Sequence, residues 1–362
     1  MATLIVTLGT SSVDLYAQKL AQELDAPKIY SDIYQEVVRL FNISWLSKSA
    51  LRAIQEDRRF IRLLNRVDGM VHLPNQHLGR YGNFLKVPYV ITVHDIIRYL
   101  DLKGYGTYIQ HHNLRDRWYL NLDYKGVKKA TRIISVSQFT KRNLMHDFGI
   151  PGEQISVIHE GVDHKVFRPL PRSQSSKYPY ILFVGSEQPR KNLSLLLRAF
   201  GKLKEERRFG ELKLVKIGKA GGPKAVFRRQ TMKLIEALGL IRDVIFTDYV
   251  LEEELPGYYS NAECLVLPSL YEGFGLPVLE AMACGCPVII SNCTSLPEIA
   301  GEAAIQVDPH DLDGLVRALE EVLTDADLRD QMVRKGLTRA SKFSWRKTAS
   351  ETLAVYQDLE TV

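Results

Sequence analysis

The amino-acid sequence predicts an α/β protein with two doubly wound domains, each built on a parallel β-sheet. Three observations support this prediction. The chain of 362 residues is long enough for about two domains, each with a substantial core. Short β-branched runs alternate with longer amphipathic stretches, which is typical of buried parallel strands between helices. A polar stretch without periodicity divides this alternation into two halves.

The first half begins with a short apolar run at the N-terminus. Its candidate strands are Leu4–Leu8, Gly69–Leu73, Val87–Val93, Arg132–Val136 and Ile155–Ile158. Each run is bounded by turn or polar residues, and helical patterns fill the intervals. We therefore expect residues 1–168 to form an N-terminal domain.

The second half repeats the alternation. Its candidate strands are Tyr180–Val184, Lys213–Ile217, Val244–Phe246, Cys264–Leu267, Pro287–Ile290 and Ala304–Val307. The amphipathic stretches between them are Asn192–Leu203, Ala225–Leu238 and Leu312–Leu323. Prolines and serines indicate a linker at 169–178, so a second domain is expected at 179–342 and a terminal helix at 343–362. Two hinged parallel sheets are expected to hold a site in the cleft beyond their carboxyl ends.

Composition indicates an ordinary water-soluble globular protein, with 45% hydrophobic and 25% charged residues. No apolar run approaches the ~18 residues that a membrane span needs. The N-terminal stretch lacks the basic region and the cleavage pattern of a signal peptide, so we expect a cytoplasmic protein. The net charge of +6 favours anionic partners such as phosphorylated substrates or an anionic membrane.

The most informative stretch is Leu267–Ala283. It leaves a predicted strand, passes Gly273, Phe274 and Gly275, and enters a helix at Leu276, with Pro277 in the first turn that proline prefers. The start of this helix offers free backbone N–H groups and the positive end of the helix dipole. The sequence therefore predicts a phosphate site above the glycine-rich loop.

Two glutamates belong to the same stretch. Glu280 lies in an apolar helical segment, where a buried carboxylate needs hydrogen-bond donors such as the hydroxyls of a ribose. Glu272 lies on the loop, where it could face sugar hydroxyls. The alternative is that both are solvated surface groups, which is the usual position of Glu. The glycines, the proline and the apolar surroundings favour the site.

A second candidate element follows the strand at Ile181–Val184. The strand ends at Gly185, and the cations Arg190 and Lys191 follow at the start of the next helix. Fixed positive charge there could neutralise a leaving diphosphate. The alternative is that both cations merely decorate a helix start, but cations oppose the helix dipole at that end. This mismatch favours a functional role.

A third element is the strand Val90–Val93, which leads directly into His94 and Asp95. A single histidine is usually a packed or surface side chain. However, the carboxyl end of a parallel strand faces the expected cleft, which makes His94 a candidate for catalysis.

The two glutamates in their Tyr-Glu-Gly-Phe-Gly-Leu-Pro context resemble the signature of the retaining GT-B glycosyltransferases of family 4, and the resemblance covers nearly the whole chain. It implies two Rossmann-like domains facing a cleft. It implies that Glu272 contacts the donor sugar, that Glu280 holds the nucleotide ribose, and that Arg190 and Lys191 neutralise the diphosphate. It also places His94 beside the sugar and phosphate, in a same-face displacement without His94 as the general base.

Further resemblances extend the expected site. The loop at Tyr249–Leu255 resembles the one behind the nucleotide base, so Val250 is a candidate for backbone contacts. The loop after the first strand is shorter than is usual in the family, so Gly9 and Thr10 are weaker candidates for holding acceptor and phosphate. The segment from Phe343 resembles the helix that returns to the first domain.

We expect no essential metal and no cofactor beyond the nucleotide-sugar co-substrate. The four cysteines lie between Cys264 and Cys293 without an intervening histidine or a CxxC pair, so reduced thiols are expected. Asp-x-Asp sequences occur at 311–313 and 325–327, but both precede helical patterns, where Asp serves as a cap.

Two segments concern the acceptor. Residues 39–66 combine an excess of basic residues with apolar ones and could contact an anionic membrane peripherally, at its inner face, although a solvated helix face explains them as well. Residues 99–124 carry aromatic, His and Arg side chains that could shape a pocket for a glycan or lipid-linked acceptor.

Two other functions remain as alternatives. A glycoside hydrolase would use Glu272 and Glu280 as its paired carboxylates, but it has no diphosphate to hold. A non-enzymatic anion-binding or nucleic-acid-binding protein would explain the positive charge and the aromatic residues. No nucleic-acid motif is present, so no nucleic-acid partner is expected.

Overall fold

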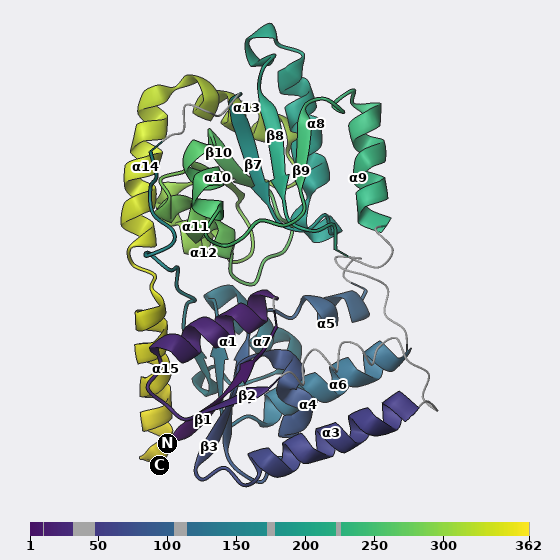
Figure 1. Ribbon diagram of the computed structural model, residues 1–362, viewed down its shortest axis with the longest axis vertical. Helices are drawn as coiled ribbons and strands as arrows, with labels where there is room; N and C mark the ends of the chain where they lie inside the picture. Colours follow the sequence, from purple (N-terminus) through teal and green to yellow (C-terminus); the bar gives the residue numbers. More distant parts are fainter. Residues whose placement is uncertain (10, 32–47, 105–113, 172–177, 222–225, 362) are drawn as a thin grey trace. The chain divides into compact units, whose positions relative to one another are not determined.

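The computed structural model describes the chain except residues 10, 32–47, 105–113, 172–177, 222–225 and 362 (Figure 1). The described residues form two compact units. The first contains the residues up to Gly161 together with Trp345–Val362, and the second contains Val162–Ser344. The first unit ends 7 residues before the expected limit at 168, the second begins 17 residues before the expected 179, and the terminal segment begins 2 residues after the expected 343. The C-terminal helix therefore belongs to the first unit.

The first unit contains a six-stranded sheet in which every neighbouring pair is parallel. Its order is β2-β1-β3-β4-β5-β6. The strands are β1 (Ala2–Thr7), β2 (Lys28–Ser31), β3 (Met70–Leu73), β4 (Tyr89–Val93), β5 (Arg132–Ser135) and β6 (Ile155–Val157). The predicted strands of this half are confirmed, with ends that differ by one or two residues.

Successive side chains of a strand point to opposite faces of the sheet, so a strand that is apolar throughout makes both faces apolar. Helices cover both faces of the first sheet. The helices are α1 (Ser12–Glu23), α3 (Lys48–Leu64), α4 (Gly79–Gly82), α5 (Ile97–Leu102), α6 (Leu114–Lys129), α7 (Gln138–Phe148) and α15 (Trp345–Glu360). Leu4 and Val6 of β1 pack with α1 and α15. Ile5, between them, packs in a separate core with side chains of α3, α4, α6 and α7.

The second unit contains another parallel six-stranded sheet, with the order β12-β11-β10-β7-β8-β9. The strands are β7 (Tyr180–Val184), β8 (Lys213–Ile217), β9 (Val244–Thr247), β10 (Cys264–Leu267), β11 (Val288–Ser291) and β12 (Ile305–Val307). All of them were predicted. The order reverses at β7 and β10, and this switch point is where open parallel sheets bind ligands.

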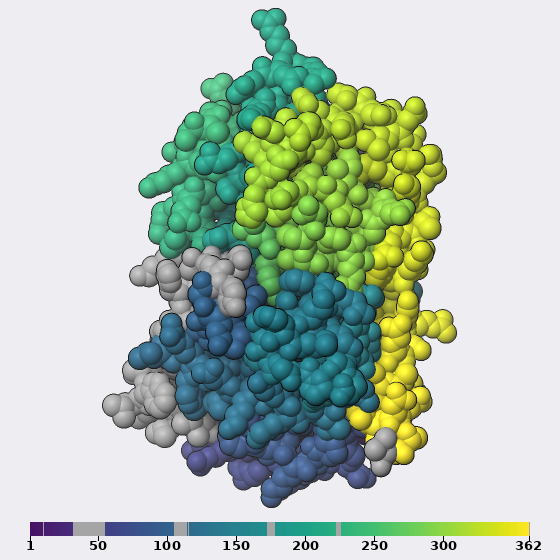
Figure 2. Space-filling view, turned by 180° about the vertical axis from the view of Figure 1, so that it is seen from behind, coloured from purple at the N-terminus to yellow at the C-terminus, as the bar shows by residue number. Residues whose placement is uncertain are grey.

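The helices of the second unit are α8 (Leu193–Lys204), α9 (Val226–Ala237), α10 (Leu255–Asn261), α11 (Leu276–Ala283), α12 (Leu296–Ala300), α13 (Leu312–Thr324) and α14 (Ala326–Ala340). One core joins the sheet to α8, α9, α13 and α14. The outer side of α14 is largely exposed and forms part of the yellow surface in Figure 2. The predicted doubly wound α/β fold is thus confirmed in both units.

One strand was missed. The edge strand β2 has the sequence Lys-Ile-Tyr-Ser, and none of its residues is fully buried. It lacks the apolar run by which the other strands were recognised, so only its pairing with β1 reveals it. No helix in the described part of the chain combines the length and the apolar character needed to span a membrane.

Candidate functional site

Three of the predicted site residues, Arg190, Lys191 and Glu272, meet in the second unit and are called the Glu272 cluster below. The Lys191 ammonium donates to Oε1 of Glu272 at 2.5 Å, and Arg190 donates to Oε2 of the same carboxylate at 3.2 Å. Ser269 adds a third donor, at 2.8 Å from Oε1. Glu272 and Lys191 are both buried, at 7% and 8% exposure. Two cations therefore share one carboxylate, which leaves an excess positive charge at the carboxyl ends of β7 and β10.

The local backbone explains how two cations come to precede a helix. Pro189–Lys191 forms a single 3-10 turn, and Asn192 adopts a left-handed conformation with φ of 53° before α8 begins at Leu193. The Asn192 amide donates to the carbonyls of Pro268 and Pro309. Arg190 is also tied to the neighbouring loop, since its carbonyl accepts from the Leu270 N–H at 2.7 Å. The helix dipole is opposed by these cations, but Glu272 stabilises them.

The electrostatics of the trio keep Glu272 ionised. Burial raises the pKa of a carboxyl group, but the charges of Lys191 and Arg190 and the hydrogen bonds from Lys191 and Ser269 outweigh it, so the pKa of Glu272 lies below its usual value. The carboxylate is thus a permanent anchor. It fixes both cations in place without fully neutralising them.

The glycine-rich loop leads into α11 as predicted. Gly275 is the N-cap residue with φ of 119°, a conformation that other residues rarely adopt, and a Cβ there would lie 2.7 Å from Leu296. Leu276 and Pro277 form the first turn, where Pro277 has no N–H and the Val278 N–H donates to the Gly275 carbonyl at 2.9 Å. The helix start therefore offers mainly the Leu276 N–H and the positive end of the helix dipole. Gly273 and Phe274 link this turn to Glu272.

Buried serines hold this loop, and the sequence analysis missed them. The Ser295 hydroxyl donates to the carbonyls of Glu272 and Phe274, at 3.0 and 2.8 Å. The Ser291 hydroxyl donates to the Ser269 carbonyl at 2.6 Å. Both lie at or beyond the end of β11. The run of small polar residues after that strand was the available signal.

Glu280 lies in α11, where its carboxylate finds the donor that the sequence analysis required. The Tyr259 hydroxyl, from α10, donates to Oε2 of Glu280 at 2.6 Å. Tyr259 is fully buried, and burial together with the nearby Glu280 charge raises its pKa well above the usual value. The phenol therefore remains a donor. Its role could not be predicted, because nothing in the sequence pairs these two residues.

A buried charge network supports the strand end at Gly185. Oε1 of Glu187 accepts from Lys216 of β8 at 2.9 Å and from Arg228 of α9 at 2.8 Å. Gly185 itself has φ of 153°, and a Cβ there would lie 3.5 Å from the Lys191 side chain. Val250 is half-buried in a largely exposed loop after β9, two strands away from β7. Val250 thus follows an edge strand, whereas Arg190, Lys191 and Glu272 follow the adjacent strands β7 and β10.

In the first unit, His94 follows β4 and is buried, at 7% exposure. Its Nδ1 lies 2.9 Å from Oε1 of Glu160, and its Nε2 lies 2.9 Å from the Pro74 carbonyl. Tyr16 of α1 packs edge-on against the imidazole, with ring centroids 4.7 Å apart. Glu160 belongs to the loop after β6 and was not a predicted site residue.

The remaining candidates of the first unit lie after β1. Gly9 follows the strand, and its carbonyl accepts from Gln18 at 2.9 Å. A Cβ at Gly9 would overlap the Asp14 carboxylate, which caps α1 together with Ser11. Thr10 lies outside the described residues.

The Asp-x-Asp sequences act as caps, as expected. Asp311 accepts from the Gly314 N–H at the start of α13, and Asp325 accepts from the Leu328 N–H at the start of α14. Asp313 pairs with Lys202 at 2.7 Å. Over the described ranges, no group of three or more His, Cys, Asp or Glu residues is placed to hold a metal ion.

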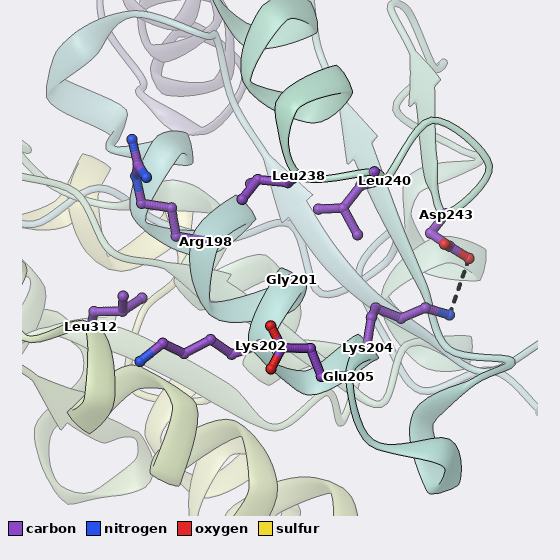
Figure 3. Close-up of a pocket in the computed structure, with 10 residues that line it drawn as sticks. Arg198, Gly201, Lys202, Lys204, Glu205, Leu238, Leu240, Asp243 and Leu312 are labelled. Carbon is purple, nitrogen blue, oxygen red and sulfur yellow. Dashed lines mark ion pairs between the residues drawn. The ribbon is translucent and has the colours of Figure 1, made fainter.

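The second unit also contains an open cavity of about 460 Å³. Figure 3 shows that α8 side chains line it beside Leu238, Leu240 and Leu312, with Lys204 paired to Asp243. Asp243 directly precedes β9, so the cavity lies at the amino end of that strand. It is therefore separate from the loops that carry the Glu272 cluster.

Comparison with known proteins agrees with the fold. A model described as Glycosyltransferase Family 4 matches residues 11–166, and one described as Glycosyl transferases group 1 matches residues 170–339. The structure resembles that of Anabaena HepE in complex with UDP and glucose, with a TM-score of 0.78 and 16% identity over 100% of this chain and 99% of that one. Both proteins have the GT-B architecture.

Two curated relatives are mannosyltransferases. The O-antigen chain mannosyltransferase B of Escherichia coli is 34% identical over 245 residues, 65% of this chain and 62% of that protein. The MMP alpha-(1->4)-mannosyltransferase of Mycolicibacterium hassiacum is 36% identical over 248 residues, 67% of this chain and 58% of that protein. The matches span less than two thirds of either relative. With both family models matched along most of its length, the chain belongs to the group 1, family 4 glycosyltransferases.

Proposed function

We propose that this protein is a retaining glycosyltransferase that moves a hexose, of the mannose or glucose/GlcNAc type, from a nucleotide-diphosphate sugar to a glycan, lipid-linked or small-molecule acceptor. One observation carries the proposal: Arg190 and Lys191 are held on buried Glu272 at the switch point of the second sheet. A diphosphate leaving group needs fixed positive charge of this kind.

The proposed chemistry uses charge and positioning. Lys191 and Arg190 stabilise the negative charge that develops on the diphosphate, and the positive end of the α11 dipole adds to this. The acceptor attacks the face that the diphosphate leaves, and the departing phosphate oxygen takes the acceptor's proton. The same anomeric configuration results. No step calls for a metal ion.

The donor's other parts are assigned to neighbouring elements. Glu280 accepts hydrogen bonds from the ribose hydroxyls, with Tyr259 fixing one of its oxygens. Val250 contacts the base through its backbone. Glu272 borders the sugar through the Gly273–Gly275 loop. Backbone contact does not select one base, so UDP, GDP and ADP sugars are all candidate donors. The two mannosyltransferase relatives favour mannose as the donor sugar.

We also propose that the first unit contacts an anionic membrane, where a lipid-linked acceptor would lie. The exposed end of α3 and the turn near it carry exposed cations and apolar side chains: Arg58, Arg59, Arg62, Leu63, Arg66, Phe84 and Lys86. The Asn65 side chain bonds the backbone of Phe84 and Lys86, which joins the two segments. Residues 39–47 of the predicted membrane segment lie outside the described residues.

The glycoside hydrolase alternative is disfavoured by electrostatics. A hydrolase needs one carboxyl group with a raised pKa to act as the general acid. Glu272 has a lowered pKa, because two cations contact it. Glu280 acts as the acceptor in its hydrogen bond with Tyr259, whereas a general acid must donate.

The experiment is an activity assay with UDP-, GDP- and ADP-hexoses, each offered with simple glycosides and with polyprenyl-phosphate-linked sugars. The proposal expects nucleoside diphosphate release and a product one hexose heavier, whose anomeric configuration matches that of the donor. Free hexose released from glycosides without any nucleotide sugar would support a hydrolase instead. A product of opposite configuration would exclude the retaining mechanism.

A further inference from the structure

Both ring nitrogens of His94 face hydrogen-bond acceptors. Nδ1 lies 2.9 Å from the Glu160 carboxylate, and Nε2 lies 2.9 Å from the carbonyl oxygen of Pro74. A carbonyl oxygen has no proton to donate, so Nε2 must carry one. The proton between Nδ1 and Glu160 belongs to the imidazole, since a histidine is ordinarily more basic than a carboxylate by about two pKa units. The geometry, together with this difference in basicity, therefore favours an imidazolium ion.

The rest of the surroundings fixes the position of His94. Its backbone N–H donates to Gln76 at 3.1 Å, and its carbonyl accepts from the Thr140 hydroxyl at 3.2 Å. The loop that carries Glu160 is itself held, because the Thr348 hydroxyl of α15 donates to the His159 carbonyl at 2.8 Å. Glu160 is only 4% exposed. The carboxylate and the imidazole are thus preorganised against each other by contacts from Gln76, Thr140 and Thr348.

The other titratable groups around His94 are compatible with one positive charge. His72 of β3 lies nearby, but burial and the charge of His94 lower its pKa to about 3, so it stays neutral between Tyr356 and Thr92. Tyr16 of α1 stays protonated, because burial raises its pKa. Asp95, next in the chain, adds a favourable negative charge.

The opposing contributions to the pKa of His94 also favour the protonated ring. Burial lowers the pKa of an imidazole, but the hydrogen bond and charge of Glu160, followed by the Pro74 carbonyl, outweigh it, so the pKa of His94 lies above its usual value. Glu160 supplies the largest opposing contribution. Without this carboxylate, burial would dominate and His94 would become neutral.

We propose that Glu160 is a positioning residue that holds His94 in its doubly protonated form, so that the first unit presents a fixed positive charge at the carboxyl end of β4. His94 then acts on an anionic substrate group through its charge and cannot serve as a proton acceptor. The catalytic part of this inference rests on the proposed transferase function. The inference about the protonation state of His94 does not rest on that function.

The first test is NMR of the full chain labelled in its histidine rings, with the His94 signal assigned by comparison with His94→Asn. In the wild type we expect a doubly protonated His94 at pH 7.5, where an ordinary histidine is mostly neutral. In Glu160→Gln we expect its pKa to fall by about one to three units. Glu23→Gln, an exposed glutamate of the same unit, is the matched control and should change nothing.

A neutral His94 ring in the wild type at pH 7.5 would overturn the proposal, even if Glu160→Gln fails to fold. An unchanged titration in a folded Glu160→Gln would also overturn it. Glu160→Asp keeps the charge and should retain a raised pKa. These readouts need no donor, so they stand apart from the transferase proposal.

The second test is the pH dependence of hexosyl transfer, measured with the donor that the activity assay identifies. Glu160→Gln should lose turnover at pH 8 by about tenfold or more and recover most of it near pH 5.5, where His94 is protonated again. A merely structural role would lower turnover by the same factor at every pH, which would contradict the positioning role. Absence of transfer by the wild type would instead count against the proposed function.

Discussion

Lys191 Nζ lies 2.5 Å from Oε1 of Glu272, although 81 residues separate the two in the chain. The contact joins the loop after β7 to the loop after β10, at the point where the strand order of the second sheet reverses. It explains why a buried lysine and a buried glutamate coexist, since the attraction between them offsets part of the cost of desolvating each. It also sets the position of the charge that would meet a diphosphate.

Replacing Lys191 with Ala should lower turnover by about 100-fold or more, because one preorganised charge in a transition-state site contributes roughly this much. The protein should stay folded, since Arg190 and Ser269 still contact Glu272. Steady-state kinetics and thermal melting measure both effects. Lys202→Ala, which removes an exposed lysine paired with Asp313, is the control and should leave turnover intact. Full activity of Lys191→Ala would refute the diphosphate assignment.

Glu272→Gln should destabilise the protein in a pH-dependent way. The folded-state pKa of Glu272 lies below its unfolded value, so its ionisation stabilises the fold above about pH 4.3, and this contribution is lost as the pH falls through the folded pKa. The difference in unfolding free energy between wild type and variant should be constant from pH 6 to 8 and shrink below pH 4. Urea titrations across this range measure it. A difference that grows in acid would show that Glu272 is not the anchored anion.

Tyr259→Phe should weaken nucleotide diphosphate binding by about tenfold while leaving the fold intact. The phenol holds one oxygen of Glu280, and without it the carboxylate loses its fixed orientation toward a ribose. Titration calorimetry measures the affinity. The neighbouring Tyr258→Phe is a matched control, because Tyr258 contributes its backbone carbonyl to Tyr180. Equal losses in the two variants would mean that the Tyr259 hydroxyl has no specific role.

Gly275→Ala should destabilise the protein by about 1–3 kcal/mol, because the N-cap of α11 has a positive φ and a Cβ would press on Leu296. Gly257→Ala, in helix α10 with open space around it, should instead be neutral or stabilising by up to about 1 kcal/mol. Denaturant unfolding measures both. Equal effects would contradict the strained loop geometry.

Reversing two charges on α3, with Arg58→Glu and Arg62→Glu together, should weaken binding to phosphatidylserine vesicles by tenfold or more, at roughly 1 kcal/mol per basic residue. Co-sedimentation measures the binding. The control is Arg334→Glu with Lys335→Glu on exposed α14, which changes the net charge equally. Equal loss in both double variants would point to a general charge effect rather than to a docking face.

The sequence predicted the elements that depend on local pattern. Apolar runs such as Tyr180–Val184 identified buried strands directly, and the proline and glycines around Gly275 identified a helix start. The edge strand β2 escaped because its half-exposed residues carry little apolar signal. Local pattern thus suffices for the buried frame of the sheets but not for their edges.

The sequence also supplied the residue types of the site but not their pairing. It predicted that Glu280 needs donors and that Arg190 and Lys191 oppose a helix dipole. It could not identify Tyr259 as the donor or Glu272 as the counter-charge, because these contacts form only when separate loops meet at one sheet edge. Glu160 was missed for the same reason, since 66 residues separate it from His94.

The most direct test of the central claim is a thermal-shift panel with UDP, GDP, ADP and their hexose conjugates, run on the wild type and on Glu280→Ala. A ligand that binds only the folded state raises the melting temperature. We expect one nucleotide class to stabilise the wild type, with the shift lost in Glu280→Ala, whose own melting temperature without ligand serves as the reference. No shift with any nucleotide at millimolar concentration would contradict the assignment of the Glu272 cluster and α11 as a nucleotide-sugar site.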